Sequence, residues 1–299
     1  MFENILVPLD GSNLAETALP PAASLAATLG ASVLLLHVIE KNAPQEVHHD
    51  RHLKEPVEAT AYLDSVAQRA FAPGLKVSTH VHSAEVQDVT ASLTEHTGEY
   101  QTDLVVMCAH GKSGFRDMIF GGIAQQVLAM AKVPMLLLQP KTVKKPQPFE
   151  LRRILVPLDN ESIHDNTLPY ARRLAKAYGA ELYLLSVVPT LNELTGQKGA
   201  ASALLPATTT VFLDMKEQAA KDHLGAHLAE LLDAGYKARA EVNRGDPASI
   251  IADVAEKIKA DLVLLGTHSR AGLQAVRARS VAPNVMKKTK IPLLLIPMQ

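Results

Sequence analysis

The loop after the apolar run 104–108 combines several glycines with the start of a helix. It runs from Met107-Cys108-Ala109-His110-Gly111 to Phe120-Gly121-Gly122-Ile123, where a helical pattern begins. Glycine lets the backbone approach a ligand closely, and the first turn of a helix presents free N–H groups to an anion. A cradle for a polyphosphate is one interpretation of this pattern. The loop alone favours the other interpretation, a plain strand-to-helix connection, because glycines are common in such loops.

Known phosphate motifs and nucleophiles explain this loop poorly. Gly111-Lys112-Ser113 resembles the end of a P-loop, but Val106 occupies the position of the required first glycine. Neither a Gly-x-Gly-x-x-Gly nor a Gly-x-Ser-x-Gly sequence occurs in the chain. Cys108 and His110 are close in sequence, yet no acid is evident that would orient the histidine. We therefore expect Cys108 to be a buried structural thiol, and we predict no catalytic residue.

Two groups of histidines have spacings that metal sites use. His48, His49 and His52 are close enough to share a helical face, and His80 and His82 are expected on one face of a strand. Imidazoles in such groups bind zinc or copper. No carboxylate or cysteine completes a recognisable ligand spacing, so a polar loop and a solvated strand end are the favoured interpretation, without a metal.

The elements that position these residues occur twice along the chain. Ile5-Leu6-Val7-Pro8-Leu9-Asp10 returns as Ile154-Leu155-Val156-Pro157-Leu158-Asp159, at an offset of 149 residues (154 − 5). Asp103-Leu104-Val105 returns as Asp261-Leu262-Val263 at an offset of 158 residues (261 − 103), so the second copy is longer in its middle. We predict two copies of one domain, at residues 1–140 and 153–299, joined by a linker at residues 141–152.

Each copy alternates apolar strands with helical patterns. We expect strands at residues 5–9, 33–38, 75–81, 104–108 and 134–138, and in the second copy near 154–158, 182–187, 236–242, 262–266 and 292–296. Helices are expected at residues 15–29, 56–71, 86–96 and 122–132, with Val57, Ala61, Val66 and Ala70 on the buried stripe of the second. The alternation predicts an α/β fold of two repeated, doubly wound domains, each a parallel sheet with helices on both faces. Such sheets bind ligands beyond the carboxyl ends of their strands.

Two further segments carry expectations about assembly. The insert at 189–210 is polar, and we expect a mobile loop there, either a lid over the second site or a plain surface insertion. The last strands, Met135–Leu138 and Leu293–Ile296, are apolar and hazardous as exposed edges. If these two strands pair with each other, the chain is a pseudo-dimer of its own halves. The alternative is a homodimer in which the strands pair between two chains.

The composition of the chain limits the classes of partner that we expect. The chain has 30 Lys and Arg against 31 Asp and Glu, so its net charge of -1 gives no drive towards nucleic acid. Cys108 is the single cysteine, which excludes an intramolecular disulfide and fits a reducing cytoplasm. No apolar run approaches the ~20 residues of a membrane helix, so we expect no membrane insertion.

The motifs together resemble one known family. A strand that ends in Val7-Pro8-Leu9-Asp10-Gly11-Ser12, followed late in the domain by a loop of the form Gly-x-x-Gly-(nine residues)-Gly-Ser/Thr, is similar to the universal stress protein family. The resemblance covers both copies. It implies five-stranded sheets of order 3-2-1-4-5, binding of an adenine nucleotide, and dimers through the last strand.

The resemblance also implies roles for residues of the first copy. Pro8, Asp10 and Val38 would surround the adenine, and Met107 and Cys108 would lie near the adenosine. The phosphates would meet the glycine segment, which consists of Gly111, Gly121, Gly122 and Ile123. Two positions depart from the family pattern, because Cys108 stands at the first glycine and Gly122 at the Ser/Thr.

The second copy departs further from that pattern. Pro157, Asp159 and Val187 correspond to the adenine-binding group, and the loop positions are Gly266, Ser269, Arg279 and Ser280. Arg279 replaces a glycine where the backbone should approach phosphate, although its charge could instead bind the phosphate. We therefore expect nucleotide binding mainly in the first domain.

The resulting prediction is a stress-response regulatory protein that binds ATP, with or without Mg²⁺, and reports to an unidentified protein partner. One alternative is a nucleotide-free scaffold or signalling protein with degenerate pockets. Another is a weak ATPase, although nothing in the sequence demands more than slow hydrolysis or autophosphorylation.

Overall fold

The computed structural model describes residues 2–47, 50–109, 122–130, 132–139, 148–159, 162–194, 204–268 and 281–298. In the first half the main strands are β1 (Asn4–Pro8), β2 (Ser32–Glu40), β5 (Val77–Val86), β6 (Leu104–Cys108) and β7 (Met135–Leu138). The second half repeats them as β8 (Arg153–Pro157), β9 (Glu181–Val188), β10 (Ala238–Arg244), β11 (Leu262–His268) and β12 (Leu293–Met298). A separate short hairpin consists of β3 (Glu46–Val47) and β4 (Asp50–Arg51).

The helices follow the strands in the same repeated order. The first half has η1 (Ala15–Ala18), α1 (Leu19–Leu29), α2 (Pro56–Ala70), α3 (Val89–Glu99) and α4 (Gly122–Met130). The second half has η2 (Ser162–Thr167), α5 (Leu168–Tyr178), η3 (Leu191–Glu193), α7 (Pro206–Asp233), α8 (Pro247–Lys257) and α10 (Val281–Lys288). No helix in the described ranges is long and apolar enough to cross a bilayer.

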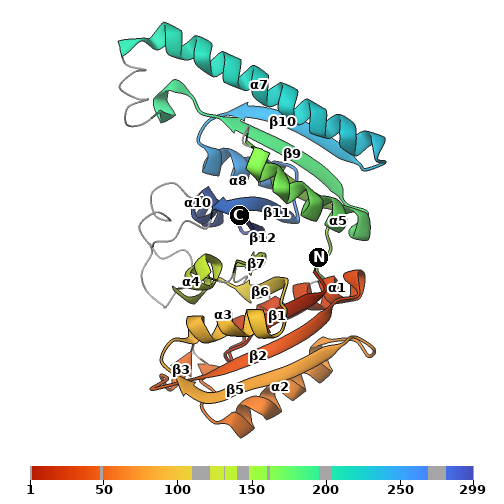
Figure 1. Ribbon diagram of the computed structural model, residues 1–299, viewed down its shortest axis with the longest axis vertical. Helices are drawn as coiled ribbons and strands as arrows, with labels where there is room; N and C mark the ends of the chain where they lie inside the picture. The colour runs from red at the N-terminus through yellow and green to blue at the C-terminus, as the bar shows by residue number, and fades with distance from the viewer. Residues whose placement is uncertain are drawn as a thin grey trace.

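All ten main strands form one continuous sheet, in the order β10-β9-β8-β11-β12-β7-β6-β1-β2-β5 (Figure 1). Within each half the order is therefore 3-2-1-4-5, and neighbouring strands of one half run parallel. This confirms the predicted doubly wound α/β fold in two copies. The exact domain boundaries at 140 and 153 stay a prediction.

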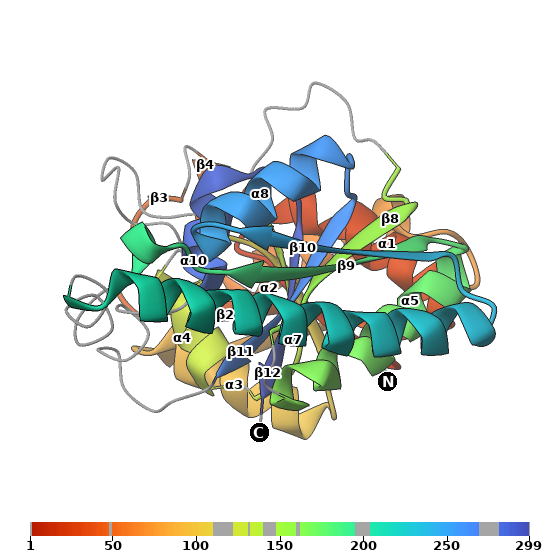
Figure 2. The same cartoon turned by 90° about the horizontal axis from the view of Figure 1, so that it is seen from above.

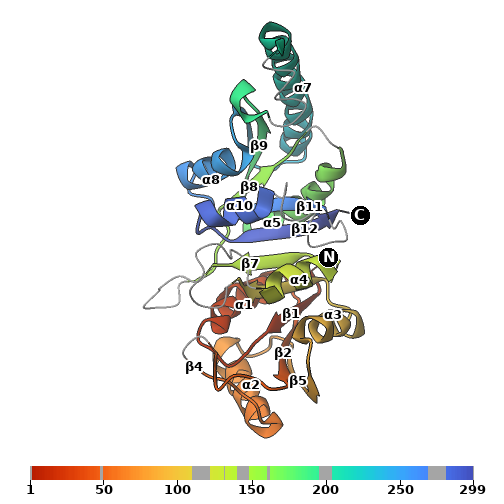
Figure 3. The same ribbon diagram turned by 90° about the vertical axis from the view of Figure 1, so that its left-hand side faces the viewer.

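The last strands of the two halves pair with each other. β7 and β12 run antiparallel, with Leu137 opposite Leu293 and Met135 opposite Leu295, and they lie side by side at the centre of the molecule (Figure 3). Each apolar edge is thereby hidden within the chain. The two halves also meet through helices α1 and α5. The Ser24 hydroxyl of α1 donates to the Phe149 carbonyl at 2.6 Å and lies 2.9 Å from the Tyr178 hydroxyl of α5.

Alternating side chains of the strands supply two apolar layers. Ile5 and Val7 point to the face covered by α1, α2, α5 and α7, whereas Leu6 points to the face covered by α3, α4, α8 and α10. Both layers run through the two halves without a break. Burial on both faces explains why β1, β2 and β6 are continuous apolar runs.

The element boundaries differ from the predictions at several places, of which two have a clear physical cause. The helix expected from residue 15 begins as η1, and α1 starts only at Leu19; Pro20 and Pro21 lack N–H groups and fit only a first helical turn. Strand β5 continues to Val86, and α3 begins after Asp88, whose side chain accepts from the Ala91 N–H at 3.0 Å.

The predicted buried stripe of α2 is confirmed at Val66, and Ala70 is partly buried, but it was wrong at Val57 and Ala61. Val57 is 83% exposed, and the buried residues are Ala59, Leu63 and Val66. Their spacing of four and three residues is the true helical stripe.

The insert predicted as a loop at 189–210 is partly helical. η3 occupies residues 191–193 and α7 begins at Pro206, while residues 195–203 lie outside the described ranges. α7 lies along β9 and β10 (Figure 2) and buries Leu213, Ala220, Leu224 and Leu231, which recur on one stripe.

Candidate functional site

The residues predicted to surround a ligand in the first half lie at the ends of three adjacent strands. β1 pairs with β2 on one side and β6 on the other, so Pro8, Val38, Met107 and Cys108 lie near one edge of the sheet. Val38, Met107 and Cys108 are buried, and Pro8 is half-buried. The topology therefore brings together residues up to 100 positions apart, as the doubly wound fold requires.

The glycine segment is only partly described. Gly122 and Ile123 begin α4, and the Ile123 side chain is exposed. Because α4 returns the chain to the start of β7, its N-terminus lies towards the carboxyl edge of the sheet. Gly111 and Gly121 lie outside the described residues, so their predicted phosphate contacts stay a prediction.

Asp10 is held in a tight turn directly after β1. Its Oδ1 accepts from the Ser12 N–H at 2.9 Å and the Ser12 hydroxyl at 2.6 Å. The Ser12 hydroxyl in turn accepts from the Ala15 N–H at 3.1 Å, which joins the turn to η1. Gly11 has a φ of 89°, a conformation that other residues rarely adopt. The turn therefore fixes a carboxylate at the edge of the sheet.

A segment that follows β2 covers this turn, and we call residues 50–53 the cap. Asp50 accepts from the backbone N–H of Asn13 at 2.8 Å and from its side-chain amide at 3.0 Å. Leu53 lies against Gly11 so closely that a Cβ on Gly11 would be 2.8 Å from Leu53 Cγ. The glycine is thus required both by its φ and by the leucine above it.

His37 ties the cap to the sheet. Its Nδ1 lies 2.7 Å from the Leu9 carbonyl oxygen and its Nε2 lies 3.1 Å from the Leu53 carbonyl oxygen. The ring is buried, and both of its partners are carbonyl oxygens, which only accept hydrogen bonds. A neutral imidazole has a single N–H, so it can donate to only one of the two. His37 was not among the residues predicted from the sequence, although a histidine inside the apolar run 33–39 was the available signal.

His52 of the cap is buried without a partner for its Nδ1 among the described residues. Burial lowers the pKa of His52, while the charges of Glu40 and Asp10 partly oppose that shift. The expectation that His52 shares a helical face was wrong, because it follows the strand β4, and His48 and His49 lie outside the described residues. A buried ring nitrogen near Asp10 costs stability unless a ligand or water bonds to it.

Cys108 is a structural thiol, as predicted. Burial raises its pKa to about 11, although a hydrogen bond with Thr17 of η1 acts in the opposite direction. At neutral pH the group is therefore a protonated thiol and a poor nucleophile. Its side chain fills space between β6 and η1.

The second half arranges the same positions differently. Pro157 and Val187 occupy the ends of β8 and β9, and Asp159 follows β8. Here Asp159 Oδ1 lies 2.6 Å from His164 Nδ1. The residues Ser269, Arg279 and Ser280 lie outside the described ranges, so their predicted roles stay predictions.

Gly266 makes room for His164. A Cβ on Gly266 would lie 2.9 Å from His164 Cδ2 and 3.0 Å from Met298 Cε. At the offset of 149 residues, His164 corresponds to Ala15 of the first half (164 − 149). The first half therefore combines a cysteine with an alanine where the second combines a glycine with a histidine. His164 was missed from the sequence, since only the contact with Gly266 shows its role.

The histidines at 80 and 82 share one face of β5, as predicted. His96 of α3 joins them there, with its Nε2 3.1 Å from His82 Nδ1. This third histidine was also missed, because its distance in sequence gave no recognisable ligand spacing.

Comparison with known proteins identifies relatives along both halves. The model of the Universal stress protein family matches residues 1–139 and again residues 150–297. The universal stress protein E homolog of Haemophilus influenzae is 24% identical over 319 residues, spanning 98% of this chain and 96% of the relative. Universal stress protein MJ0531 of Methanocaldococcus jannaschii is 28% identical over 147 residues, 48% of this chain and 81% of the relative. The crystal structure of a universal stress protein from Archaeoglobus fulgidus shares the fold, with a TM-score of 0.69 at 20% identity over 99% of this chain and 96% of its own.

Proposed function

The chain belongs to the universal stress protein family, and from this premise we propose that its first half binds one adenine nucleotide. The ligand would lie at the ends of β2, β1 and β6, beside Pro8, Asp10 and Val38. Met107 and Cys108 would contact the adenosine. The phosphates would meet the N-terminus of α4 at Gly122 and Ile123, together with Gly111 and Gly121.

The observation that carries this proposal is the difference between the two aspartates. Asp10 accepts from its own turn, and nearby lies a buried ring nitrogen of His52 that has no partner among the described residues. Asp159 instead lies against His164, whose ring fills the space beside Gly266. A polar ligand in the first half would satisfy His52, whereas a ligand in the second half would have to displace His164.

The residues of the first half fit a nucleotide in their donors and acceptors. A carboxylate can accept a hydrogen bond from an amino group or a ribose hydroxyl, and helix N-termini favour phosphate. Cys108 is larger than the glycine of the family pattern, but it lies against Thr17. We propose ATP as the ligand, with Mg²⁺ bound through the phosphates.

The protein would act as a regulatory nucleotide sensor in a stress response, which transmits its loaded state to a protein partner. A scaffold without nucleotide is the second candidate, and His37 and Leu53 favour it because they close the cap over the turn after β1. Slow hydrolysis would be seen as phosphate release that requires Mg²⁺.

Titration calorimetry with ATP and Mg²⁺ tests the proposal. We expect one site per chain in the wild type and about 10- to 150-fold weaker binding in Asp10→Asn, since a hydrogen bond to a charged group contributes about 1.5–3 kcal/mol. Asp159→Asn is the matched control and should leave the affinity unchanged. No heat of binding in the wild type would establish the scaffold, and equal weakening in both variants would contradict the assignment to the first half.

A further inference from the structure

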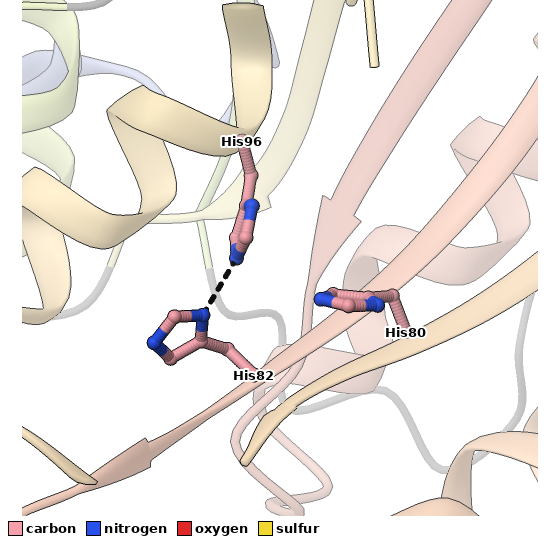
Figure 4. A group of neighbouring side chains, drawn as sticks. All are labelled: His80, His82 and His96. Atoms are coloured by element: carbon pink, nitrogen blue, oxygen red, sulfur yellow. Dashed lines mark hydrogen bonds between the residues drawn. The ribbon is translucent and has the colours of Figure 1, made fainter. Parts of the chain in front are cut away.

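Three histidine rings meet between the edge strand β5 and helix α3 (Figure 4). His80 and His82 come from β5 and His96 comes from α3, and one ring nitrogen of each lies within 4.8 Å of the others. The rings of His80 and His82 are centred 5.0 and 5.1 Å from that of His96. The cluster is thus compact enough for one ion.

The hydrogen-bonded pair of nitrogens has nearly the separation of two metal ligands. His82 Nδ1 and His96 Nε2 lie 3.1 Å apart. Two nitrogens at ~2.1 Å from a tetrahedral zinc lie about 3.4 Å from each other. His80 and His82 are only half-buried, so rotation of the His80 side chain can bring its nitrogen to the same distance.

Glu99 sets the tautomer of His96 that a metal requires. His96 Nδ1 lies 2.8 Å from Glu99 Oε2, so this nitrogen carries the proton and donates to the carboxylate. The lone pair of His96 is then on Nε2, which points into the cluster. A carboxylate behind a ligating histidine is the usual outer partner in zinc sites.

Aromatic rings enclose His80 on the side of α3. The ring of His96 is centred 5.0 Å from that of His80. Tyr100 completes the wall, with its ring 5.5 Å from that of His80.

A simpler account is a chain of hydrogen bonds from His82 through His96 to Glu99. That chain satisfies His96 but gives no role to His80, whose ring packs against those of His96 and Tyr100. A metal ion would use all three imidazoles, because His80 would then be a third ligand beside the half-buried His82 and the buried His96.

We propose that His80, His82 and His96 bind one divalent transition metal ion, with Zn²⁺ preferred, and that Glu99 positions His96 for it. Three histidines leave a fourth coordination position, which water or another ligand can fill on the open side of β5. The site belongs to the first half, where His82 of β5 is the register partner of Val38 of β2. It therefore adjoins the proposed nucleotide site, but metal binding does not require the nucleotide.

The chain offers a matched control in its second half. Asp165, His223 and His227 also gather within 4.8 Å. There, however, His223 Nε2 is hydrogen-bonded to Asp165 Oδ1 at 3.0 Å and His227 Nε2 lies 3.3 Å from Asp165 Oδ2, so contacts with one carboxylate account for the arrangement. His223→Asn therefore removes a comparable histidine from outside the proposed site.

The test is titration of metal-free full-length protein with Zn²⁺ against a chromophoric chelator, in the absence of nucleotide. Co²⁺ absorption serves as a second readout of coordination. We expect one tight site in the wild type and in His223→Asn, and its loss in His82→Asn. Glu99→Gln should bind 10- to 100-fold more weakly while retaining the Co²⁺ spectrum, as expected for a positioning residue.

Circular dichroism and thermal unfolding of the metal-free variants establish that each is folded. His82 is half-buried on an edge strand, so His82→Asn avoids the burial that makes a His96 variant risky. Absence of a tight site in the wild type would overturn the proposal. Retention of the site in His82→Asn together with its loss in His223→Asn would place the metal in the second half and overturn it equally.

Discussion

Where the first half has Cys108 and Ala15, the second half has Gly266 and His164. This difference predicts that substitutions at positions 266 and 164 have strongly coupled effects on the free energy of unfolding. In Gly266→Ala the new Cβ would lie 2.9 Å from the His164 ring and 3.0 Å from Met298 Cε. Overpacking of this kind costs about 1–3 kcal/mol. At about 2–4 °C per kcal/mol for a domain of this size, the midpoint of thermal unfolding should fall by several degrees.

His164→Ala should also destabilise the protein, because it removes the contact with Asp159 and leaves a space beside Gly266. In the double variant the alanine at 266 enters the space that His164 left, as Cys108 does beside Ala15. The two losses should therefore not add, and we expect a favourable coupling of about 1–2 kcal/mol.

Differential scanning calorimetry of the four proteins measures this cycle. Gly225→Ala is a useful control, because a Cβ there would meet no atom within 4 Å. Losses that add to within about 0.5 kcal/mol would refute the reasoning. In that case His164 would not fill the space that Gly266 provides.

Three further outcomes follow from the described contacts. Burial lowers the pKa of His52, so the unfolded chain binds more protons than the folded chain below about pH 6.5. Acidification below that pH should therefore reduce the free energy of unfolding. Denaturant titrations at several pH values should show a smaller loss in His52→Gln. Cys108 is buried and its pKa is about 11, so it should react with a thiol reagent only after unfolding. Rapid reaction of the native protein would show that the thiol is accessible. Gln139 donates to the carbonyls of Met286 and Thr289 across the two halves, so Gln139→Ala should cost about 1–3 kcal/mol in urea unfolding, whereas no change would show that the contact is unimportant.

The fold could be predicted because its signals are local and repeated. The apolar runs 5–9 and 154–158 and the alternation of strand and helix are legible without any long-range contact. They also place Pro8, Asp10 and Met107 at one edge of the sheet, since the ends of adjacent parallel strands meet there.

The missed parts of the site depend on contacts that sequence spacing does not encode. The segment between β2 and α2 has no periodicity, so nothing indicated that Leu53 would lie on Gly11 or that His37 would bind its carbonyl. His96 reaches His82 only because α3 packs on β5 in one particular register. The His164 ring can occupy its position only because Gly266 has no side chain there.

The central claim is that the chain binds one nucleotide and that the first half holds it. The most direct test is the binding stoichiometry of ATP with Mg²⁺ for the wild type and for Gly121→Arg, which gives the first half the arginine of position 279. We expect one site in the wild type and none in the variant. Two sites in the wild type, or an unchanged site in Gly121→Arg, would contradict it.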